Sequence, residues 1–114
     1  MTTNPNTEIP EVIEVEKPQF ESLYHLVLLD DDQHTYDYVI EMLASIFGYG
    51  PGKAWALARV VDTQGQAILQ TASNERCKAN QERIHSYGAD SRIPTSLGSM
   101  SAIIEKASMP SDIR

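Results

Sequence analysis

The sequence predicts an α+β protein, a two-layer sandwich in which three helices pack on a three-stranded antiparallel sheet. Two observations predict this fold class. Short apolar segments rich in β-favouring residues alternate with segments whose apolar residues recur at helical spacing, in the order β-α-α-β-α-β. Three short strands do not form a stable sheet by themselves, so we expect the helices to cover it.

Size and composition fit one small domain. The chain has 114 residues, of which 41% are hydrophobic, enough for a single modest core. The net charge of −7 disfavours nucleic acid and anionic membranes as partners, because both are bound through basic faces, and it favours a positively charged ligand. No apolar stretch is long enough to span a membrane. Since Cys77 is the only cysteine, we expect a reducing cytoplasm, no disulfide, no metal and no cofactor.

The N-terminal segment differs from the rest of the chain. Residues 1–22 contain three prolines, and five glutamates against a single lysine, a composition that opposes stable secondary structure. It has no basic start followed by an apolar run, so we do not expect a signal peptide. We therefore predict a flexible acidic tail over 1–22, a folded core over 23–107 and a C-terminal tail over 108–114.

The first half of the core is expected to hold a strand and two helices. Residues 23–29 are apolar and β-favouring, which indicates a strand, and a loop follows over 30–34. Thr35 is a suitable cap for a helix through Phe47, in which apolar residues return every three or four positions. After a glycine-rich break, a second helix is predicted over 51–61, with a proline in its first turn.

The second half supplies the remaining two strands and one helix. Residues 66–71 indicate a short strand, and a mostly polar helix is predicted over 74–87. A loop rich in small and polar residues spans 88–100, and the last strand is expected over 100–107.

The first predicted strand ends in three consecutive aspartates, Asp30, Asp31 and Asp32. Like charges repel, so this position favours a cationic partner, either a metal ion or an ammonium group. A receiver-like phosphoacceptor domain is one alternative, with Asp30 and Asp31 holding Mg²⁺, Asp62 accepting phosphate and Lys106 pairing with it. That architecture requires about five parallel strands, whereas here two helices follow each other with no strand between them.

A second resemblance covers most of the core. The stretch Asp30-Asp31-Asp32-Gln33-His34-Thr35-Tyr36-Asp37-Tyr38-Val39, the two helices after it and the turn Val61-Asp62-Thr63-Gln64-Gly65 resemble the ClpS family over roughly 24–107. This resemblance implies a three-stranded antiparallel sheet with three helices. It also implies a monomeric, non-enzymatic adaptor that binds N-degron proteins by their first residue and delivers them to a Clp family AAA+ unfoldase, docking to that protein's N-terminal domain.

The resemblance also implies how the substrate is held. Its α-amino group is bound by the residues at positions 30, 31 and 62, where Asp31 keeps the family carboxylate, Asp30 replaces an asparagine and Asp62 replaces a histidine. A free N-terminus is an ammonium with three donors, which an internal peptide bond lacks, so carboxylates beside an apolar hole select chain ends. The implied pocket for the first side chain consists of His34, Tyr36, Val39, Ala58 and Val61.

Two further regions take roles from the resemblance. Glu75, Lys78 and Asn80 are implied to dock to the Clp ATPase, with Asn80 standing where the family has a lysine. In the loop over 88–100, Ile93 or Leu97 is expected to contribute an apolar residue to the pocket. The departures at positions 30 and 62 leave open a diverged partner-binding module that has lost amine recognition.

Overall fold

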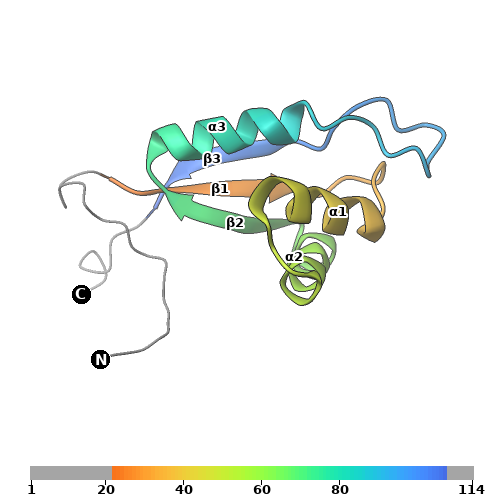
Figure 1. Ribbon diagram of the computed structural model, residues 1–114, viewed down its shortest axis with the longest axis horizontal. Helices are drawn as coiled ribbons and strands as arrows, with labels where there is room; N and C mark the ends of the chain where they lie inside the picture. The colour runs from red at the N-terminus through yellow and green to blue at the C-terminus, as the bar shows by residue number, and fades with distance from the viewer. Residues whose placement is uncertain (1–21, 108–114) are drawn as a thin grey trace.

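The computed structural model describes residues 22–107 and confirms the predicted fold class (Figure 1). The elements follow in the predicted order: β1 (Tyr24–Leu29), α1 (Tyr36–Phe47), α2 (Pro51–Gln64), β2 (Gln66–Ala72), α3 (Asn74–His85) and β3 (Ala102–Lys106). The predicted tails lie outside the described residues, except for Ser22. No helix in the described part of the chain is long and apolar enough to cross a membrane.

The sheet has the strand order β2-β1-β3, with both neighbours antiparallel to the central strand β1. The pairing of β1 with β2 shifts between Leu26 and Val27. A receiver domain requires a parallel sheet of about five strands, so the receiver-like alternative is wrong. Among residues 22–107, moreover, no group of three or more histidine, cysteine, aspartate or glutamate side chains has the geometry to hold a metal ion.

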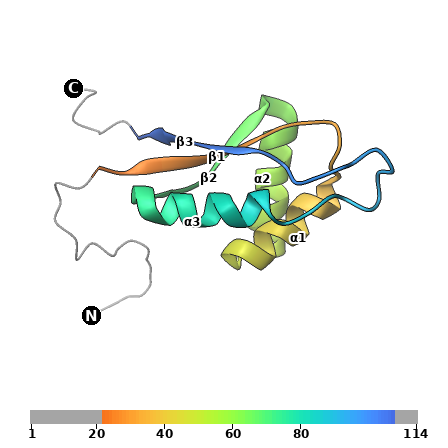
Figure 2. The same cartoon turned by 90° about the horizontal axis from the view of Figure 1, so that it is seen from above.

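The core lies between the sheet and the helices. Leu26 and Leu28 of β1 are fully buried against Met42 and Leu43 of α1 and Ile84 of α3. Helix α3 runs along the sheet, while α1 and α2 gather at one end of it, beside the long loop before β3 (Figure 2). The end of β1, the start of α1 and the end of α2 therefore meet in one region, and the site lies there.

The largest difference from the predicted boundaries is the end of α2. Helix α2 continues to Gln64 rather than ending at residue 61, because the first residue able to terminate it is Gly65, which has a φ of 88°. Asp62 is consequently in the last turn of a helix. Helix α3 ends at His85 instead of residue 87, and β3 spans 102–106 instead of 100–107. Hydrogen bonds extend the pairing of β3 by one residue at each end, from Leu29 N to the Ser101 carbonyl and from Ala107 N to the Leu23 carbonyl.

Candidate functional site

A pocket of about 330 Å³ opens between the start of α1, the end of α2 and the loop after β1. Its walls contain all eight residues predicted for the amine site and the first-side-chain pocket, together with three that were not predicted. The complete lining is Asp30, Asp31, Asp32, His34, Thr35, Tyr36, Val39, Ala58, Val61, Asp62 and Met100.

The pocket has an apolar part and an acidic part. Val39 from α1, Ala58 and Val61 from α2, and Met100 from the long loop are all at most 5% exposed and also belong to the hydrophobic core. Asp30, Asp31, Asp32 and Asp62, by contrast, are exposed residues of the same pocket. Negative oxygens and an apolar cavity are therefore adjacent.

A backbone hydrogen bond brings Asp30 close to the end of α2, where Asp62 lies. Asp30 N donates to the carbonyl of Gly65, which fixes the end of β1 against the turn that follows α2. Partial desolvation in the pocket raises the pKa of the Asp30 carboxyl. A hydrogen bond from the Asp31 backbone opposes this shift, and the negative charges of Asp62, Asp31 and Asp32 add to it. The negative charge of Asp62 therefore acts on Asp30, although one residue follows β1 and the other lies in α2.

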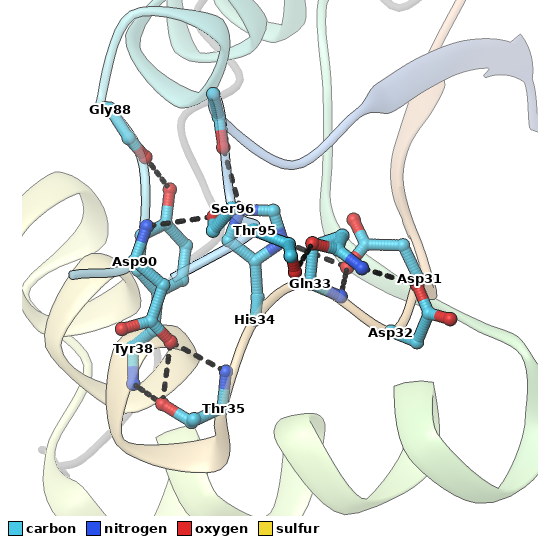
Figure 3. A network of polar contacts seen from close by, with 11 residues as sticks. Asp31, Asp32, Gln33, His34, Thr35, Tyr38, Gly88, Asp90, Thr95 and Ser96 are labelled. Atoms are coloured by element: carbon cyan, nitrogen blue, oxygen red, sulfur yellow. Dashed lines mark hydrogen bonds and ion pairs between the residues drawn. The ribbon is translucent and has the colours of Figure 1, made fainter. Parts of the chain in front are cut away.

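His34 is buried behind Asp31 (Figure 3). Its side chain is only 3% exposed; Nδ1 lies 2.8 Å from Asp31 Oδ1, and Nε2 lies 2.7 Å from the carbonyl oxygen of Gly98. Both ring nitrogens are therefore within hydrogen-bond distance of a partner. Asp31 Oδ1 also accepts from Gln33 N at 2.9 Å. His34 thus lines the pocket as predicted, and its Nδ1 positions the carboxylate of Asp31.

A second hydrogen bond joins the two helices at the pocket. The Tyr36 hydroxyl, at the start of α1, donates to Asp62 Oδ2 in the last turn of α2 over 2.7 Å. This bond raises the pKa of Tyr36, and burial and the charge of Asp62 add to the effect. Tyr36 and Asp62 were assigned from the sequence to different parts of the site, yet they are in direct contact.

The loop over 88–100 is ordered by Asp90, which the sequence analysis did not identify. The Asp90 carboxylate is fully buried; Oδ2 accepts from Thr35 N and Thr35 Oγ1, both at 2.7 Å, and Oδ1 accepts from Arg92 N and Arg92 Nη1, both at 3.0 Å. Figure 3 shows Asp90 and Thr35 facing each other at the start of the helix. Burial by itself would raise the pKa of Asp90, but these hydrogen bonds outweigh it and hold the pKa well below its usual range.

The same loop connects to the acidic segment at two further points. Thr95 Oγ1 donates to Gln33 Oε1 over 2.7 Å, and Gly98 provides the carbonyl that His34 contacts. Met100 fills the role expected of Ile93 or Leu97: neither of those two lines the pocket, and Leu97 is 94% exposed. That expectation is wrong because the loop turns back at Ser96, whose side chain and backbone bond within the loop to Asp90 and Ile93, leaving Leu97 outside.

The three residues expected to contact the Clp ATPase lie on α3, apart from the pocket. Glu75 and Lys78 are exposed. Asn80 is partly buried, and its Nδ2 donates to Gln70 Oε1 of β2 at 3.0 Å. The structure therefore presents two of these side chains to solvent and uses the third within the fold.

Comparison with known families places the chain among the adaptors of the Clp protease. The family described as ATP-dependent Clp protease adaptor protein ClpS matches residues 19–97. The chain therefore belongs to the ClpS family, whose members are adaptors and not enzymes. The family resemblance predicted from the sequence is confirmed.

Individual relatives agree with this assignment. The ClpS adapter of Pectobacterium carotovorum is 32% identical over 79 residues, covering 69% of this chain and 74% of its own. The E3 ubiquitin-protein ligase ubr-1 of Caenorhabditis elegans is 28% identical over 100 residues, but the chain spans only 5% of its length. The structure of Agrobacterium tumefaciens ClpS2 bound to L-phenylalaninamide has a TM-score of 0.65 at 16% identity, covering 75% of this chain and 98% of that one.

Proposed function

We propose that this ClpS family member binds N-degron proteins by their first residue and delivers them to a Clp AAA+ unfoldase. Asp30, Asp31 and Asp62 receive the α-ammonium group, and the apolar part of the pocket receives a bulky first side chain. The observation that carries the proposal is the position of three carboxylates and an apolar cavity in one pocket of about 330 Å³.

The acidic part suits an ammonium group. A free N-terminus offers three N–H donors and a positive charge, while an internal peptide group is neutral and has a single donor. Each hydrogen bond between the ammonium and a carboxylate contributes about 1.5–3 kcal/mol, so the site discriminates strongly against blocked chain ends.

The apolar part suits a large hydrophobic side chain. A dry cavity of about 150 Å³ is enough to bind benzene, so a pocket of about 330 Å³ holds an aromatic or branched side chain together with the ammonium. Burying such a side chain against Val39, Val61 and Met100 contributes about 1.5–3 kcal/mol. The L-phenylalaninamide bound by Agrobacterium ClpS2 is an aromatic amino-acid amide and has this same combination of groups.

Delivery requires a separate surface for the unfoldase. We assign it to the exposed side of α3 around Glu75 and Lys78, because this helix leaves the pocket open to the substrate. Asn80 supports that surface by fixing α3 to β2 through Gln70. We propose that the adaptor acts as a monomer in the cytoplasm and binds the N-terminal domain of its Clp AAA+ unfoldase.

Binding of fluorescent peptides to the full chain, measured by anisotropy, tests the proposal. Peptides that begin with Phe or Leu should bind, whereas the same peptides with an acetylated N-terminus or a first Gly should not. Asp31→Asn should weaken binding at least about tenfold, since it removes a charged acceptor. Asp37→Asn is the matched control, because Asp37 is an exposed acid in the first turn of α1 that does not line the pocket. Equal binding of free and acetylated peptides would instead mean a partner-binding module without amine recognition.

A further inference from the structure

We infer that Tyr36 is a binding residue for the substrate's ammonium, acting with Asp62 as one hydrogen-bonded unit that makes the site selective for a primary α-amine. This inference rests on the proposed function and extends it to a residue assigned only to the side-chain pocket. It also narrows the ligand class from free N-termini in general to those with three N–H donors.

The hydrogen bond between Tyr36 and Asp62 has only one possible direction. A phenol has one proton, and the ionised carboxylate has none, so Tyr36 is the donor in this 2.7 Å contact. With that proton committed to Asp62, the phenol oxygen can only accept from any other group. Tyr36 therefore adds an acceptor to a pocket that already contains the carboxylates of Asp30 and Asp31.

Asp62 itself lies at an electrostatically unfavourable position. A carboxylate in the last turn of a helix faces the negative end of the helix dipole, and here it also lies near Asp30, so repulsion favours turning it away from the pocket. Arg59, one turn earlier on α2, makes no ion pair with Asp62; its guanidinium lies 5.7 Å from the centre of the Trp55 ring. The Tyr36 hydroxyl is the only hydrogen-bond donor to Asp62 among residues 22–107, and it holds one carboxylate oxygen while leaving the other for a ligand.

The number of acceptors in the pocket defines the ligand class. The ligand-facing oxygens of Asp30, Asp31, Asp62 and Tyr36 are all acceptors, so a primary ammonium can direct each of its three N–H groups at one of them. A secondary ammonium, as in an Nα-methylated peptide or one that begins with proline, has only two N–H groups and therefore leaves one more acceptor without a donor than a primary ammonium does. Such ligands should bind less tightly even when their first side chain fits the pocket.

Peptide affinities of Tyr36→Phe test this inference. The substitution keeps the aromatic wall and removes only the hydroxyl. Tyr49→Phe is the matched control, because the Tyr49 hydroxyl donates to the Leu69 carbonyl and Tyr49 does not line the pocket. Each variant and the unsubstituted chain are titrated with a Phe-first peptide and with its Nα-methylated form, and thermal unfolding verifies that all three proteins fold.

The expected result is non-additivity: the effects of methylating the peptide and of removing the Tyr36 hydroxyl on the binding free energy should not sum. In the unsubstituted chain, methylation should weaken binding about tenfold, and Tyr36→Phe should weaken binding of the unmethylated peptide by a similar factor. In Tyr36→Phe, methylation should cost much less than tenfold, because the N–H and its acceptor form the same bond. Tyr49→Phe should behave like the unsubstituted chain.

Three other results would overturn the inference. Unchanged or tighter binding by Tyr36→Phe would mean that Tyr36 competes with the ligand for Asp62. Weaker binding by Tyr36→Phe, with methylation of the peptide still weakening binding about tenfold, would mean that Tyr36 acts only on the fold of the pocket. Failure of the unsubstituted chain to bind any peptide with a free N-terminus would remove the proposed function as well, and so differs from the first two outcomes.

Discussion

Replacing Asp90 with asparagine should cost the folded state several kcal/mol. The Asp90 carboxylate accepts four hydrogen bonds, two from Thr35 and two from Arg92, at a site with no solvent exposure. Asparagine retains one acceptor oxygen and places an NH₂ group against two of those donors. At least two bonds to a buried charge are then lost and donors are left without a partner, for which about 3–5 kcal/mol is expected.

That amount is a large part of the total stability. A domain of this size has roughly 5–10 kcal/mol, and its urea m-value is about 1 kcal/mol/M. Urea unfolding followed by circular dichroism at neutral pH should therefore show a midpoint about 3–5 M lower for Asp90→Asn. Asp37→Asn, which changes an exposed aspartate at the other side of the Thr35 cap, should shift the midpoint by less than about 1 M.

The loss of stability in Asp90→Asn should depend on pH. The pKa of Asp90 is lowered in the folded state, so its contribution to stability is fully present above the unfolded value of about 3.9 and is lost as pH falls through the folded value. The stability difference between the unsubstituted chain and Asp90→Asn should accordingly be constant from pH 5 to 8 and shrink below about pH 4. A difference below about 1 kcal/mol at pH 7, or one that grows in acid, would refute this account of the loop.

Two further predictions concern ligand binding. Because the pKa of Asp30 is raised, peptide affinity should fall as the pH drops through that raised value. Affinity should also fall in alkali once the peptide's amine, with a pKa of about 7.7–8.0, loses its proton. Affinity that stays unchanged in calorimetric titrations as the pH falls through the range in which carboxyl groups titrate would show that Asp30 does not face the ammonium. Ala58→Met should fill the apolar part of the pocket and weaken binding of a Phe-first peptide at least about tenfold, whereas Ala56→Met, exposed on the same helix, should not. Equal affinities of the two methionine variants would place the first side chain elsewhere.

The fold could be predicted from the sequence because its signals are local. Apolar periodicity and the glycine breaks are read within a few residues, and they determined every element and its order. The end of α2 was misjudged since its last apolar residue, Val61, precedes three polar residues that remain helical until Gly65 allows the chain to turn. Polar residues inside a helix terminus leave no periodic signal.

The site was predictable only where a family pattern supplied long-range information. The eight residues taken from that pattern line one pocket, although they are separated by up to 32 positions. Asp90 was missed because its partner Thr35 lies 55 residues away, and a lone aspartate in a polar loop resembles any other turn residue. Asp62 was noticed as a departure from the family pattern and Tyr36 was assigned to the first-side-chain pocket, but a sequence alone does not show that the two residues contact each other.

Together, these contacts explain how several aspartates coexist around one pocket before a ligand arrives. Each carboxylate is stabilised by a hydrogen bond from the protein. Asp31 has Gln33 N and His34 as partners and Asp32 the Gln33 side-chain amide, while Asp62 has the Tyr36 hydroxyl and Asp30 the Asp31 backbone. In Asp31 and Asp62 the donors bind one oxygen, which leaves the second free of hydrogen bonds from residues 22–107.

This arrangement preorganises the pocket before a ligand arrives. Donors on the protein side fix the orientation of each carboxylate, so an arriving ammonium does not have to order flexible side chains. Because the free oxygens of Asp31 and Asp62 come from a loop and a helix that are tied together by Asp30 N and the Gly65 carbonyl, their separation is set by the fold. Selectivity for a charged chain end thus depends on the hydrogen-bond donors behind the aspartates as much as on the aspartates themselves.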